Sequence, residues 1–190
     1  MGAPDLLGLV SPAAGNQVQS GAALQTFVSA YLGNVLEHEE WPLICKAYEL
    51  ASRGETRELI DLDGECATRY AKHPGASASI RVGQRQLSKL RPMRDNRLVQ
   101  RYLAAIAAGE ASGWHAIVYG VTLAMFQLPL RQGLVHYAVQ TLKGFVGPLR
   151  ATALLTEAHK ESVLAEAEAA LPMFLQRVLP GGDAPPLRTV

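Results

Sequence analysis

The segment from Trp114 to Leu130 is apolar on nearly every side, and it constrains the fold more than any other stretch of the chain. A membrane-spanning helix needs about 20 apolar residues. This segment is shorter, and His115, Gln127 and Pro129 interrupt it. A helix that is hydrophobic all round is otherwise buried in the centre of a protein. The segment therefore predicts the central buried helix of a bundle, with no membrane association.

The sequence on both sides repeats apolar residues at helical spacing, and no stretch alternates long enough to predict a strand. A low aromatic content of 6% also favours helices over sheets. We therefore expect an all-α, single-domain bundle of seven to eight helices around the central apolar helix. The expected helices cover 24–36 with an acidic end at 38–40, 41–51, 55–72, 77–90, 96–108, 114–130, 133–146 and 148–170, the last followed by a kink at Pro172.

At 190 residues the chain has the length of one domain. We predict a loosely ordered N-terminal segment over 1–23, a helical domain over 24–178 and a disordered tail over 179–190. The N-terminus lacks the basic region and apolar run of a signal peptide. Cys45 and Cys66 have no zinc-site spacing. We expect two core thiols in a cytoplasmic protein, with one optional disulfide as the alternative.

The net charge of +1 gives no reason to expect a nucleic-acid partner or an acidic membrane surface. Two local charge clusters each leave two interpretations open. The first is either a solvated face or a contact for an acidic partner; it comprises Arg81, Arg85, Lys89, Arg91 and Arg94. The second is either a solvated helix end or a loose divalent-ion site; it comprises Glu37, His38, Glu39 and Glu40.

The sequence carries none of the local motifs that mark common catalytic sites: no P-loop, no G-x-S-x-G and no dinucleotide-binding glycine motif. No Glu stands three residues before a His, as a carboxylate-bridged metal site in a bundle requires. The run 61–64 resembles part of a calcium loop, but Leu59 and Tyr70 would occupy its first and last ligand positions. These absences favour a protein that is not an enzyme and holds no metal or cofactor tightly.

Three stretches, in chain order, resemble the UreF family of urease accessory proteins. The first stretch is Leu24–Phe27 leading to Trp41–Leu43, and the second is Gly54–Leu59 followed by Ile80–Leu87. The third and most specific runs from His115 to Gly120, followed by Leu128, Tyr137 and Val146–Leu149. It is similar to the family's H-x-x-x-[FY]-G helix and the V-G-P segment after it. The resemblance extends over residues 24–171.

The resemblance implies a helical scaffold for nickel insertion that binds UreD (UreH), recruits the GTPase UreG and bridges both to apo-urease. It also implies a homodimer, with nickel handled only within the complex. The partner-binding residues that it implies are Glu55, Arg57, Glu58, Gly83, His115, Tyr119, Gly120, Gly147 and Pro148. From the residues alone, packing is the alternative for those on the apolar helix and for Gly83, and a solvated face is the alternative for Arg57 and Glu58.

The sequence departs from the family pattern at both ends. The N-terminal P-x-G-G-F-x-H-S segment and the C-terminal tail with its final R-L-F are not present, and Arg150 stands where the family has Gly. These departures indicate a divergent paralogue or an incomplete gene model. Two other classes of function stay open. One is a small helical enzyme or ligand-binding bundle with a pocket beside 114–130, lined by His115, His136 and Tyr137. The other is a helical adaptor with unrelated partners.

Overall fold

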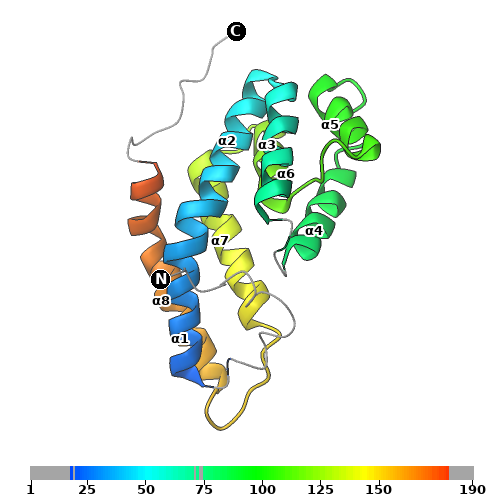
Figure 1. Cartoon of the computed structure of the whole chain (residues 1–190). Helices are drawn as coiled ribbons and strands as arrows, with labels where there is room; N and C mark the ends of the chain where they lie inside the picture. Colours follow the sequence, from blue (N-terminus) through cyan, green and yellow to red (C-terminus); the bar gives the residue numbers. More distant parts are fainter. Residues whose placement is uncertain (1–17, 19, 71, 73–74, 180–190) are drawn as a thin grey trace.

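A continuous helical run from Gly21 to Arg53 spans most of the length of the molecule (Figure 1). The computed structural model describes residues 18, 20–70, 72 and 75–179. The run consists of α1 (Gly21–Ala30), the π-helical segment η3 (Tyr31–Glu40) and α2 (Trp41–Arg53). It begins three residues before the predicted start because the Ser20 side chain accepts a hydrogen bond from the N–H of Ala23.

The prediction of two separate helices over 24–51 is wrong, because the chain does not break at 38–40. In η3 the hydrogen bonds shift to a wider turn, and at its end the N–H of Trp41 donates to the carbonyl of Leu36, five residues earlier. The wider turn ends directly before Pro42, which stands in the first turn of α2 where its missing N–H costs little. The acidic residues that were expected to close a helix therefore lie inside one.

The described residues form an all-α fold, as predicted, in which six further helices follow the long run. They are α3 (Thr56–Tyr70), α4 (Ala76–Ser88), α5 (Arg97–Ala108), α6 (His115–Met125), α7 (Leu130–Val146) and α8 (Glu157–Val178). None of these helices combines the length and the hydropathy that a membrane crossing requires, as far as the described residues go. The parts predicted to be loosely ordered at 1–17 and 180–190 lie outside the described residues.

The buried side chains form two clusters, one in each half of the molecule. The lower core lies among α1, η3, α7 and α8, and the upper core lies among α2, α3, α4 and α5 (Figure 1). Helix α6 contributes to both, because Ala116 and Leu123 face the lower core whereas Ile117 and Val121 face the upper core. The prediction of a central apolar helix is therefore confirmed.

Two of the predicted helices have boundaries that are wrong by several residues. Helix α6 ends at Met125 instead of Leu130, since Gln127 adopts a φ of 53° and Pro129 caps the following helix. Helix α8 begins at Glu157 instead of Pro148, because Thr156 and His159 form a capping box there. It continues through Pro172 to Val178, so that the predicted end at Ala170 is also wrong.

Candidate functional site

A cavity of about 490 Å³ opens beside the start of α6. Its walls come from the junction of η3 and α2, from the end of α3, from the start of α4, and from α6 and α7. Most of the lining is apolar, and polar side chains converge on it: Glu40, His115, Tyr119, His136 and Tyr137. A volume of this size and a lining of this kind are typical of ligand pockets.

Three aromatic rings form one wall of the cavity. His115 and Tyr119 lie one turn apart on α6, and both rings contact the ring of Tyr137 on α7, with centroids 5.2 Å and 5.0 Å away. The hydroxyl of Tyr119 donates to the carbonyl of Gly133 at 3.1 Å. Burial lowers the pKa of His115 to about 4. The imidazole is therefore neutral at neutral pH, with one nitrogen that donates and one that accepts.

Glu40 places a carboxyl group among tyrosines at the same cavity. The hydroxyl of Tyr31 donates to its Oε2 at 2.5 Å. Burial raises the pKa of Glu40 to about 7, and hydrogen bonding from Tyr31 and Tyr137 offsets only part of this effect. The site therefore holds a carboxyl group that changes charge near neutral pH.

Replacing Glu40 with glutamine is expected to stabilise the protein progressively as the pH rises from about 5 to about 8. The raised pKa means that the folded state holds the proton more tightly than the unfolded state does. The wild type therefore loses stability between its unfolded pKa near 4.5 and its folded pKa near 7, on the order of 3 kcal/mol in total. Glutamine has no proton to lose and still accepts from Tyr31.

The measurement is urea denaturation of both proteins across that pH range. The exposed Glu49 on α2, replaced with glutamine, is the matched control and should give a nearly constant difference from the wild type. A constant difference for the Glu40 variant as well would contradict the prediction.

The loop before α6 is held in place by Asp63 of α3, whose side chain is fully buried. The carboxylate accepts four hydrogen bonds. The donors are the Tyr102 hydroxyl at 2.5 Å and the backbone N–H groups of Ser112, Gly113 and Trp114 at 2.5, 3.0 and 3.3 Å. A negative group at this position also interacts favourably with the positive N-terminal end of the α6 helix dipole. Asp63 thereby fixes where α6 begins and so where His115 points.

Two glycines bring neighbouring helices into backbone contact around this loop. A Cβ atom at Gly83 on α4 would lie 2.1 Å from the carbonyl oxygen of Gly113. A Cβ atom at Gly120 on α6 would lie 2.5 Å from the carbonyl oxygen of Ile44 on α2. These contacts leave no room for a side chain, so α4, α6 and α2 fit together only with glycine at both positions.

The predicted partner-binding residues do not form one cluster. His115 and Tyr119 line the cavity. Arg57 and Glu58 are exposed at the start of α3, and Glu55 is half-buried beside them. The start of α3 lies about 20 Å from the end of that helix, which lines the cavity. Gly147 and Pro148 are exposed after α7.

The structure places Gly83 and Gly120, which were predicted as partner contacts, between helices of this chain. Both residues are buried between helices of this chain and present no surface to a partner. This placement agrees with packing, the alternative interpretation of each residue.

The sequence predictions missed the two acids that organise the site, the buried Asp63 and the half-buried Glu40. Asp63 stands four residues after Leu59 and three before Cys66, and so on the apolar face of α3, which is a recognisable signal of a buried polar group. Glu40 gave no such signal, because the acidic run around it is typical of a solvated helix end. Its neighbour Glu37 is also buried, and it pairs with Arg177 through both carboxylate oxygens.

The other titratable groups of the site do not assemble into a metal centre. Within residues 18, 20–70, 72 and 75–179, no three His, Cys, Asp or Glu side chains lie close enough together to hold a metal ion. Cys45 and Cys66 are free, and burial raises the pKa of each thiol to about 11, so both are protonated at neutral pH. Nε1 of Trp114 is buried beside the cavity without a hydrogen-bond partner among the described residues.

Comparison with known proteins gives one finding that bears on identity. The family model of UreF matches residues 18–148. This range contains α1 to α7, the cavity and the loop that Asp63 holds. No curated protein matches the chain.

Proposed function

The chain belongs to the UreF family of urease accessory proteins, and on this premise we propose that it is a non-catalytic scaffold that binds UreD (UreH) and recruits the GTPase UreG. A role in urease maturation follows from the family, which is one of accessory proteins and not of enzymes. The observation that carries the proposal is the extent of the match, which includes every helix from α1 to α7.

The proposed mechanism is the positioning of partner proteins, with nickel held only within the assembled cytoplasmic complex and passed to apo-urease there. The exposed residues are the proposed contacts: Arg57 and Glu58 at the start of α3, and Gly147 and Pro148 after α7. His115 and Tyr119 would contact a partner only through a side chain that enters the cavity. We also propose that the scaffold acts as a homodimer.

Co-purification with UreD and UreG of the same organism tests this function. The wild type is expected to elute with both proteins in gel filtration. Replacing Arg57 and Glu58 together with alanine is expected to weaken the complex about tenfold, since both side chains are exposed to solvent. Replacing Lys46 and Glu49 of α2, whose side chains are 52% and 42% exposed, with alanine is the control. If the folded wild type binds neither protein, the proposed function is wrong.

The cavity favours a second candidate function, the binding of a small and largely apolar ligand. His115, His136 and Tyr137 converge on it, as expected for a ligand-binding bundle. Native mass spectrometry of the same purified samples distinguishes the two functions. If the protein carries a bound small molecule and does not bind UreD or UreG, the result supports the second candidate function.

A further inference from the structure

The net charge of +1 conceals a strong asymmetry in where the charges lie. Residues 81–101 contain seven basic side chains and one acidic side chain, Asp95, and therefore carry a charge of +6. The rest of the chain carries −5. The seven residues are exposed and together make up what we name the basic face: Arg81, Arg85, Lys89, Arg91, Arg94, Arg97 and Arg101.

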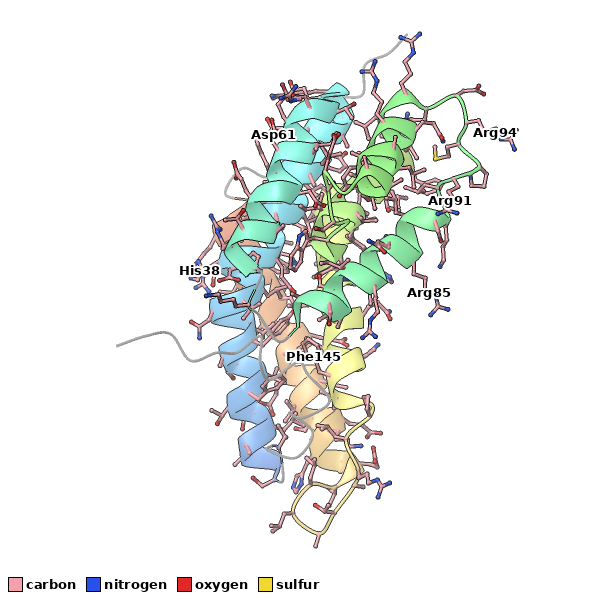
Figure 2. The ribbon with its side chains drawn as sticks, turned by 45° about the vertical axis from the view of Figure 1, so that its right-hand side comes forward. His38, Asp61, Arg85, Arg91, Arg94 and Phe145 are labelled. Carbon is pink, nitrogen blue, oxygen red and sulfur yellow. The ribbon has the colours of Figure 1, made fainter. Side chains whose placement is uncertain are left out.

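The described part of the chain provides no salt-bridge partner for the basic face. Among the described residues, the six salt bridges join other pairs, and none includes a member of the basic face. Arg85, Arg91 and Arg94 extend outward from α4 and the turn after it, on one side of the molecule (Figure 2). Side chains of like charge held together without counter-charges repel one another, and binding an acidic surface relieves that repulsion.

Apolar side chains accompany the basic face. Val82 is 48% exposed on α4, between Arg81 and Arg85. Beyond the turn, the amide of Asn96 donates to Sδ of Met125, which brings the end of α6 beside the start of α5. The next residues of that α6–α7 turn are exposed as well, Phe126 by 56% and Leu128 by 44%. Apolar side chains next to arginines are typical of protein–protein interfaces.

From these observations we infer that the basic face is a docking surface for an acidic protein surface that also presents apolar side chains. Six of the seven cations are arginines, whose planar groups bind carboxylates through two hydrogen bonds. A nucleic acid fits less well, because residues 81–101 contain no aromatic side chain on which a base could stack. The inference goes beyond the proposed function and holds whichever proteins the scaffold recruits.

The test measures binding of the full chain to a fluorescein-labelled peptide rich in glutamate with interspersed leucines. Fluorescence anisotropy is expected to show binding that weakens about tenfold between roughly 50 and 200 mM salt, and no binding to the same peptide with glutamine for glutamate. Replacing Arg85, Arg91 and Arg94 together with glutamine is expected to weaken binding by about tenfold.

The matched control replaces Lys46, Arg53 and Lys143 with glutamine, which changes the net charge equally but lies outside the basic face. This variant is expected to bind like the wild type. Equal weakening by both triple variants would overturn the inference, because net charge alone would then explain the binding. Tighter binding of a single-stranded oligonucleotide of the same charge, or of phosphatidylserine vesicles, would also overturn it.

Discussion

Replacing Asp63 with alanine is expected to lower the free energy of unfolding by about 4 kcal/mol. The variant removes the acceptor of four hydrogen bonds from a fully buried site. The Tyr102 hydroxyl and the N–H groups of Gly113 and Trp114 are then left without a partner out of reach of water, and the partly buried N–H of Ser112 also loses its partner. Each such group costs about 1–3 kcal/mol, less whatever the loop recovers by moving toward solvent.

Asp61 is the matched control for this measurement by urea denaturation. It lies two residues earlier on α3 and is exposed, with a single 3.8 Å contact to Arg57 (Figure 2). Its replacement with alanine is expected to change stability by less than about 0.5 kcal/mol. Replacing Tyr102 with phenylalanine, which removes one of the four donors, should cost about 1 kcal/mol. Equal stability of the Asp63 and Asp61 variants would show that the hydrogen-bond network does not hold the loop.

Replacing Gly83 with alanine is expected to destabilise the protein by about 3 kcal/mol, although alanine is the better helix former by about 1 kcal/mol. The new methyl group would lie 2.1 Å from the carbonyl oxygen of Gly113 and 2.8 Å from the backbone nitrogen of His115. These are backbone atoms that cannot rotate away, so α4 must move off the start of α6. The movement exposes part of the upper core and displaces the cavity wall.

Gly64 on α3 is the control, because a Cβ atom there meets nothing within 4 Å. Replacing it with alanine is expected to stabilise the protein by about 0.5–1 kcal/mol. Thermal unfolding of both variants gives the comparison. If the melting temperatures of both variants shift in the same direction, the packing argument is contradicted, since helix propensity alone would then explain both results.

Helical periodicity predicted the fold because each helix buries one stripe of its own sequence. Leu24, Phe27 and Val28 were identified in this way, and all three are buried in the lower core. The prediction failed at boundaries set by contacts outside the local sequence. The break expected after Leu36 does not occur, because residues 31–40 continue as a π-helix and Glu37 finds a counter-charge in Arg177.

The candidate site was predictable only in part, for a related reason. His115 and Tyr137 stood out as aromatic or titratable residues near the apolar helix, and they do meet at the cavity. Asp63 pairs with Tyr102, which stands 39 residues later in the chain, and Glu40 pairs with Tyr31, which stands nine residues earlier. A single sequence does not specify such pairs. The sequence contains the residues of the site, but their pairing depends on the assembled fold.

The closing of the lower core by α7 and α8 has a consequence for synthesis on the ribosome. The ring of Phe27 on α1 packs against Phe145 on α7, at a centroid distance of 5.9 Å, and Leu171 of α8 is buried in the same cluster. At about 5–20 residues per second, the apolar stripe of α1 is translated roughly ten seconds before these partners emerge. The apolar stripe of α1 is therefore exposed through most of elongation, and it is open to non-native contacts during that interval.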